Sequence, residues 1–252
     1  MNNEPEDITQ QADESSNRDI AQTQEEHIHS FEIPDSINAK IDSFYESFKN
    51  AENQEKRFIF ADSLVEAYKT VGKLDSSAKY SEVRAIEIPS LENWLQAGNG
   101  YYEMFNFTVD QTRRNEAAEK AREYYIRILE EDPSMLDVKS KLAMTYVASP
   151  NPMAGITMLR EVVEEDPENE LAIYNLGILA ITSGQLERAL ERFQNLIRIN
   201  PDSPEGNFYM GYCLLETDQE KDAIPFFEKV ITLGNNRDLV LASEDYLKRI
   251  NK

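Results

Sequence analysis

Residues 169–201 read NELAIYNLGILAITSGQLERALERFQNLIRINP, and this stretch decides the fold. Its apolar residues recur at helical spacing within 169–182 and again within 186–199, which predicts two amphipathic helices joined by a short turn. Pro201 ends the second helix, because the residue before a proline is disfavoured in the helical region. The stretch therefore predicts one hairpin of two antiparallel helices.

Similar stretches precede and follow this one at intervals of about 34 residues. Proline ends the second helix at three evenly spaced positions, Pro133, Pro167 and Pro201. Each hairpin also has a small residue in both helices, which allows the paired helix to approach closely. In the first helices these residues are Gly98, Ala143, Gly177 and Gly211, and in the second helices they are Ala121, Gly155, Ala189 and Ala223.

An interval of this length, with Ala-x3-Phe in the second helix, resembles the tetratricopeptide repeat. Ala189 and Phe193 carry this motif, and Ala223 and Phe227 repeat it. The resemblance implies an all-α fold, a right-handed α-solenoid of stacked antiparallel helix hairpins with about five repeats and capping helices at both ends. A hairpin cannot bury its apolar face alone, so neighbours must stack, and the stack has a long concave surface suited to holding another protein.

Composition and repeat spacing divide the chain into two domains. Residues 1–35 carry ten acidic residues and one base with few apolar residues, so we expect a disordered acidic tail. Residues 36–252 carry the repeats. Within them we expect a diverged part at 36–90, a repeat with an extended hairpin at 91–133, regular repeats at 134–235 and a capping helix at 236–252.

The repeat at 91–133 departs from the regular spacing. Trp94, Gly98 and Tyr101 match the first helix of the tetratricopeptide pattern, but Ala121 of the second helix comes about eleven residues late. We expect the extra residues to lengthen the helices, so that this hairpin projects beyond its neighbours at the turn.

The net charge of −21 restricts the kinds of partner. An acidic surface repels phosphate backbones, so we expect no nucleic acid and consider basic proteins the easier partners, unless the charge serves only solubility. The sequence has no apolar run of about 18 residues and no start that resembles a signal peptide. We therefore expect no direct membrane insertion and a cytoplasmic location, the alternative being a periplasmic domain of an anchored protein.

The sequence gives no sign of catalysis. It contains none of the common nucleotide-binding, metalloprotease or hydrolase motifs, and its two histidines, His27 and His29, lie in the acidic tail. We therefore expect a protein that is not an enzyme and has no catalytic, cofactor-binding or metal-binding residues. Cys213 is the only cysteine, which excludes an intrachain disulfide and is typical of a small buried residue.

The resemblance implies that the first helix of each repeat lines the concave surface. Register with the family pattern places mostly apolar and aromatic side chains there, where a solvated surface should be polar, and this indicates an interaction site. The predicted groove residues are Leu95, Tyr102, Met144, Val147, Leu171, Tyr174, Ile178, Ile181, Phe208, Tyr212 and Leu215, interspersed with the polar residues Asn99, Asp137, Ser140 and Glu205. These positions include no lysine or arginine, which argues against the clamp that family members use for chaperone carboxylates.

Two functions are compatible with this groove. The first is a non-enzymatic scaffold or adaptor that binds a protein or peptide, with an amphipathic helix or apolar segment as the best fit. The alternative is a self-assembling or membrane-tethered assembly factor, in which the protein's own helices or a second copy fill the groove. In that case the protein is a homo-oligomer or its groove is closed.

Overall fold

The computed structural model describes residues 34–250, and all regular secondary structure in this range is helical. The predicted acidic tail lies outside the described residues apart from its last two positions, and the first described helix begins at Asp35. The helices are α2 (Asp35–Lys49), α3 (Gln54–Thr70), α4 (Leu74–Glu87), α5 (Leu91–Phe107), α6 (Gln111–Glu131), α7 (Leu136–Val147), α8 (Pro152–Glu165), α9 (Glu170–Thr182), α10 (Leu186–Ile199), α11 (Pro204–Glu216), α12 (Glu220–Leu233) and α13 (Arg237–Ile250).

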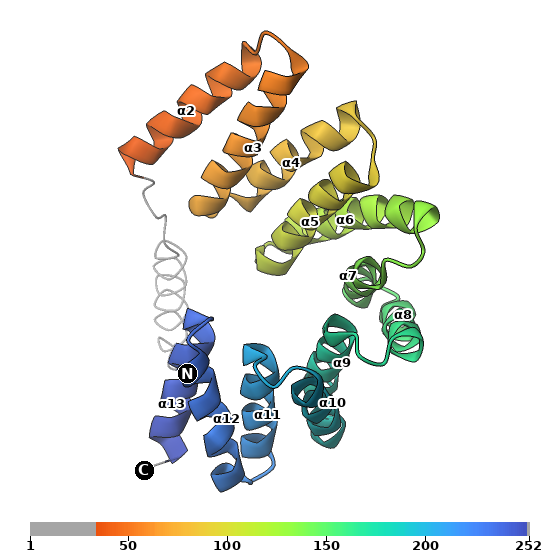
Figure 1. Cartoon of the computed structure of the whole chain (residues 1–252), viewed down its shortest axis with the longest axis vertical. Coiled ribbons are helices and arrows are strands. Elements are labelled where there is room, and N and C mark those ends of the chain that lie inside the picture. Colours follow the sequence, from red (N-terminus) through yellow and green to blue (C-terminus); the bar gives the residue numbers. More distant parts are fainter. Residues whose placement is uncertain (1–33, 251–252) are drawn as a thin grey trace, which may run out of the picture.

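Each helix packs against the next along the chain, and the series follows a wide arc from α2 to α13 (Figure 1). The hairpins α7–α8, α9–α10 and α11–α12 stack one after another within this arc. In Figure 1, α7 and α9 lie nearer the inside of the arc than α8 and α10. The prediction of an all-α solenoid of stacked helix hairpins is confirmed.

Small residues in the first helices make room for aromatic rings from the second helices. Phe193 of α10 is fully buried, and a methyl group added to Gly177 of α9 would lie 2.6 Å from the end of its ring. Likewise, a methyl group added to Gly211 of α11 would lie 3.0 Å from the ring of Phe227 on α12. The two rings fill the centres of their hairpins because the facing helix has no side chain there.

The hairpin of α5 and α6 is longer than the others. These helices have 17 and 21 residues, against 12 to 14 in each helix from α7 to α12. Asp110 caps α6 by accepting a hydrogen bond from the backbone N–H of Arg113 at 2.8 Å, so the second helix starts soon after the first ends. Phe107 and Val109 are exposed at the turn between them.

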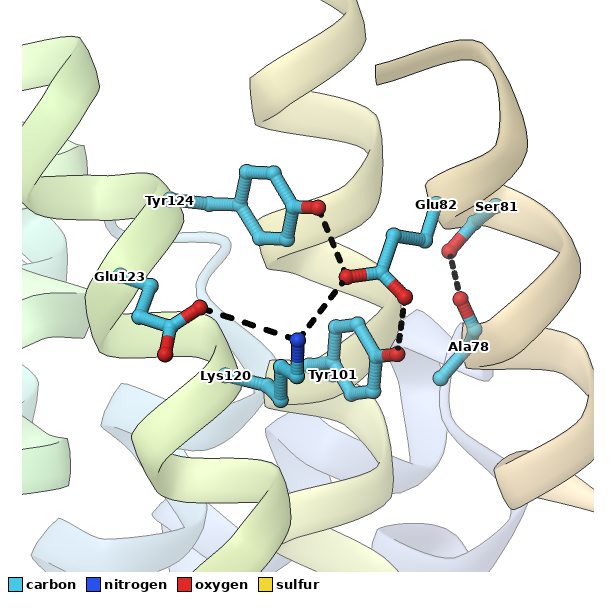
Figure 2. A network of polar contacts seen from close by, with 7 residues as sticks. All are labelled: Ala78, Ser81, Glu82, Tyr101, Lys120, Glu123 and Tyr124. Atoms are coloured by element: carbon cyan, nitrogen blue, oxygen red, sulfur yellow. Dashed lines mark hydrogen bonds and ion pairs between the residues drawn. The ribbon is translucent and has the colours of Figure 1, made fainter. Parts of the chain in front are cut away.

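A partly buried carboxylate joins the N-terminal helices to this long hairpin. Glu82 of α4 accepts hydrogen bonds from the hydroxyls of Tyr101 on α5 and Tyr124 on α6, each at 2.7 Å, and lies 3.3 Å from the ammonium of Lys120 on α6 (Figure 2). Burial alone would raise the pKa of Glu82, but the two hydroxyls and the ammonium together lower it. The network ties three successive helices to one another through a single charged group.

We predict that Gly155→Ala destabilises the solenoid. A Cβ atom at Gly155 of α8 would overlap the backbone oxygen of Ala143 on α7, so the two helices would have to separate. Overpacking of this kind costs about 1–3 kcal/mol, measurable as a loss in unfolding free energy by urea denaturation. Gly206→Ala is the control, since the nearest atoms to its Cβ would belong to side chains, at 3.1 Å. Equal effects of the two substitutions would contradict the close helix contact.

We predict that Glu82→Gln lowers the unfolding free energy by about 1–2 kcal/mol at neutral pH, because the bonds to Tyr101 and Tyr124 lose their charge. The folded-state pKa of Glu82 lies below its ordinary value of 4.5, so the carboxylate stabilises the fold above that value. This contribution is lost as the pH falls through the lower folded-state value.

The difference in unfolding free energy between wild type and Glu82→Gln should therefore shrink on acidification. Glu123→Gln is the matched control, because Glu123 is mostly exposed and its ion pair with the same Lys120 is longer, at 3.7 Å. If the difference in unfolding free energy between wild type and Glu82→Gln stays constant as the pH is lowered, the carboxylate charge does not hold these helices together.

Candidate protein-binding surface

The first helices of the repeats form the inner side of the solenoid. Besides the contacts within hairpins, α7 contacts α9, α9 contacts α11, and α11 contacts α13. No comparable contact joins α8 to α10 or α10 to α12 within residues 34–250. Because the first helices approach one another more closely than the second helices do, the stack curves with the first helices inside. We call the surface formed by α5, α7, α9 and α11 the inner surface.

A cavity of about 420 Å³ opens where α9 and α11 begin. Leu196 of α10, which is buried, lies beneath it, and Leu171 and Tyr174 of α9 form its apolar wall. The complete lining is Glu170, Leu171, Tyr174, Leu196, Ser203 and Glu205. Leu171 and Tyr174 belong to the predicted groove residues.

Side-chain caps set the ends of the two helices beside this cavity. Asn169 accepts a hydrogen bond from the backbone N–H of Ala172 at 2.9 Å and so begins α9. Ser203 accepts one from the N–H of Gly206 at 3.0 Å and so begins α11. Both capping residues are buried. Their hydrogen bonds fix the backbone next to the opening of the cavity.

Tyr174 is held at the cavity wall by other aromatic rings. Its ring centre lies 5.8 Å from that of Tyr209 on α11, and Tyr209 in turn stacks on the buried Phe193 at 5.4 Å. Burial, followed by the neighbouring Tyr209, raises the pKa of Tyr174, so its hydroxyl stays protonated near neutral pH. The side chain therefore offers an apolar ring together with a neutral hydroxyl.

Two carboxylates flank the cavity. Glu170 accepts a hydrogen bond from the amide of Asn200 at 2.9 Å, and Glu205 lies 3.4 Å from the amide of Asn236. Neither forms an ion pair with a basic side chain among the described residues. Both lie in the first turn of a helix, where their negative charge interacts favourably with the positive end of the helix dipole. The cavity thus combines an apolar wall with a negative rim.

A polar cluster lies farther along the inner surface, between α5 and α7. Asn99 accepts hydrogen bonds from the ammonium of Lys141 at 2.8 Å and from the hydroxyl of Tyr125 at 3.0 Å. Burial lowers the pKa of Lys141, although Asp137 opposes this. The groove positions predicted from the repeat register include no lysine or arginine. Sequence reasoning missed Lys141, because its position in the repeat looks the same as that of a solvent-exposed lysine.

Two predicted groove residues lie elsewhere. Phe208 is only 8% exposed, because two other rings pack against it. The centre of its ring lies 6.0 Å from that of Tyr246 on α13 and 5.9 Å from that of Phe227 on α12. Val147 lies against Gly155 of the paired helix α8, at the contact within its own hairpin. These side chains belong to helix packing, and we leave them out of the binding surface.

The other predicted groove residues are half-buried by neighbouring helices. Ile178 and Ile181 pack against the α9–α10 core, and Tyr212 meets Tyr246 of α13 with ring centres 6.2 Å apart. Tyr102 packs against Phe105 and Tyr125. The remaining members of this set are Leu95, Met144 and Leu215. Of the eleven predicted groove residues, Leu171 and Tyr174 line the cavity.

The described residues offer little for metal or thiol chemistry. No group of three or more His, Cys, Asp or Glu side chains among residues 34–250 is placed to hold a metal ion. Burial, together with Glu216, raises the pKa of Cys213 to about 12, so its thiol stays protonated. Within the same range, every helix is too short or too polar to cross a bilayer.

Comparison with known proteins finds one family and several distant relatives. Residues 151–205 match the tetratricopeptide repeat family. The chain is 27% identical to the mouse protein O-mannosyl-transferase TMTC3 over 117 residues, which cover 45% of this chain and 13% of that protein. It is 23% identical to the BBSome complex member BBS4 homolog of Drosophila melanogaster over 113 residues, or 45% of this chain and 23% of that one. The chain thus matches less than a quarter of the length of these relatives.

Among solved structures, MamA from Desulfovibrio magneticus RS-1 superposes with a TM-score of 0.48 and 18% identity. The superposition covers 72% of this chain and 97% of the MamA chain.

We predict that Phe208→Ala lowers the unfolding free energy by about 3–5 kcal/mol, because it empties a buried aromatic site between α11, α12 and α13. Tyr212→Ala, one turn along the same helix, should cost less than half as much, since Tyr212 is only half-buried. Urea unfolding followed by circular dichroism measures both. Similar losses for the two variants would mean that α13 does not cover Phe208.

Proposed function

We propose that this chain, a member of the tetratricopeptide repeat family, is a non-enzymatic scaffold that binds a segment of another protein on its inner surface. A solenoid of helix hairpins presents an extended concave face and concentrates no catalytic groups at one point. This arrangement favours binding of a partner over chemistry.

One observation carries the proposal, the cavity between α9 and α11. Protein segments anchor themselves by placing one or two apolar side chains in a desolvated pocket. Leu171, Tyr174 and Leu196 provide such a pocket, and the ring contact of Tyr174 with Tyr209 gives it a defined shape before any partner arrives. A preformed pocket loses little conformational entropy on binding.

The charges around the cavity indicate the chemistry of the partner. Glu170 and Glu205 lie at its rim and form no ion pair with a basic side chain in the described part of the chain. A partner with an apolar side chain beside a lysine or arginine would place the apolar group against Leu171 and the cation between the carboxylates. An amphipathic helix with this pairing at helical spacing suits the surface best.

We predict that Leu171→Asp weakens partner capture by about 1 kcal/mol or more, because a carboxylate at the apolar wall has no partner for its charge. The measurement is quantitative mass spectrometry of proteins retained from native cells by wild-type and variant baits. Gln194→Asp is the matched control, since Gln194 is exposed on α10 and does not line the cavity.

Loss of specific proteins with Leu171→Asp, and their retention with Gln194→Asp, supports the proposal when circular dichroism confirms equal helicity. Identical retained sets for all three baits would overturn it. If the protein lost from the Leu171→Asp bait is a second copy of the chain, the groove serves self-assembly instead.

A further inference from the structure

The outer side of the solenoid has a second cavity, between α8 and α10. Its floor is the back of α9, where Leu176 and Ala180 are nearly buried. The cavity has a volume of about 210 Å³. Because α8 and α10 do not pack closely against each other, the floor between them stays accessible from outside. We call this cavity the outer pocket.

Three arginines line the outer pocket. Arg160 projects from α8, and Arg188 and Arg192 project from α10. None of them forms an ion pair with an acidic side chain within residues 34–250, and in the same range Arg188 donates a hydrogen bond to the amide oxygen of Gln185. Glu191 also lines the pocket. In a chain of net charge −21, three guanidinium groups left without carboxylate partners around one pocket are unusual.

The fold does not require these arginines. One repeat later, the positions equivalent to Arg160, Arg188 and Arg192 hold Gln194, Asp222 and Phe226. Helices α10, α11 and α12 pack together with those residues just as α8, α9 and α10 do with the arginines. The small and aromatic residues that pack the hairpins are shared between the repeats, whereas the arginine cluster is particular to this one. A cluster that packing does not explain points to binding.

We propose that the outer pocket binds an acidic segment of a partner protein. A planar guanidinium donates two parallel hydrogen bonds to one carboxylate, so Arg160 and Arg192 on opposite walls are suited to holding side chains of Glu or Asp. An apolar side chain next to those acids would lie on Leu176 and Leu179 at the floor. The ligand is therefore an acidic peptide with an apolar residue among its carboxylates.

The surroundings argue for a short acidic peptide rather than a long polyanion. Glu191 lines the pocket and Glu187 lies one turn away on α10, so a nucleic acid or an anionic membrane meets repulsion beside the arginines. A peptide of a few residues touches only the pocket itself. The outer pocket then accepts acidic segments while the inner cavity suits basic ones, and neither site depends on the other.

The test uses fluorescence anisotropy with the labelled peptide Glu-Leu-Glu-Glu-Leu-Glu and the full chain. Wild type should bind it saturably, and Arg160→Gln/Arg192→Gln should bind about tenfold more weakly or worse, because two charge-assisted contacts are lost. Arg198→Gln is the matched control, since Arg198 is an exposed arginine of α10 that contacts Asn195 and does not line the pocket. It should bind within about twofold of wild type.

Two comparisons make the result decisive. The peptide Gln-Leu-Gln-Gln-Leu-Gln should not bind, because it lacks the carboxylates. Equal binding of the acidic peptide by all three proteins, or no saturable binding by wild type, would overturn the proposal. Inorganic phosphate should compete only weakly. If phosphate displaces half of the labelled peptide at a concentration below the dissociation constant of the peptide, the pocket binds phosphate groups instead.

Discussion

The close approach of paired helices at small residues is the constraint on which this structure depends. Gly177 leaves space for the Phe193 ring, and Gly155 touches the backbone of α7. With these contacts made, each hairpin becomes a flat unit whose two outer faces can stack on the next hairpin. Stacking in turn brings the first helices together on one side and leaves the second helices farther apart on the other. The outer pocket follows from this difference in spacing.

The two sides therefore offer different surfaces from the same repeat. On the inner side, α9 and α11 enclose Leu171 and Tyr174 under a rim of carboxylates. On the outer side, the gap between α8 and α10 exposes the back of α9 between arginine walls. Variation at exposed positions costs the hairpin little, because its stability comes from the buried small and aromatic residues. A solenoid can acquire binding sites of opposite charge in this way while its core stays the same.

The sequence predicted the helices and their stacking well, because small residues recur every 34 residues or so at the positions where paired helices approach closely. The range 186–199 predicted for the second helix coincides with α10 (Leu186–Ile199). Prediction of the groove was weaker. Register shows which face of a first helix points away from its own partner, but it does not show where the following helix lies. Phe208 is buried for that reason, since α13 packs over it as a further first helix would.

The proposed function requires above all that a partner segment lies in the cavity between α9 and α11. A photo-crosslinking amino acid placed at Leu171, with the same group at the outer residue Gln194 for comparison, tests this most directly in cells. We predict that crosslinks from position 171 join a partner peptide containing an apolar residue beside a lysine or arginine, and that position 194 does not reach this peptide. Crosslinks to the same peptide from position 194 alone, or none from position 171, would contradict the claim.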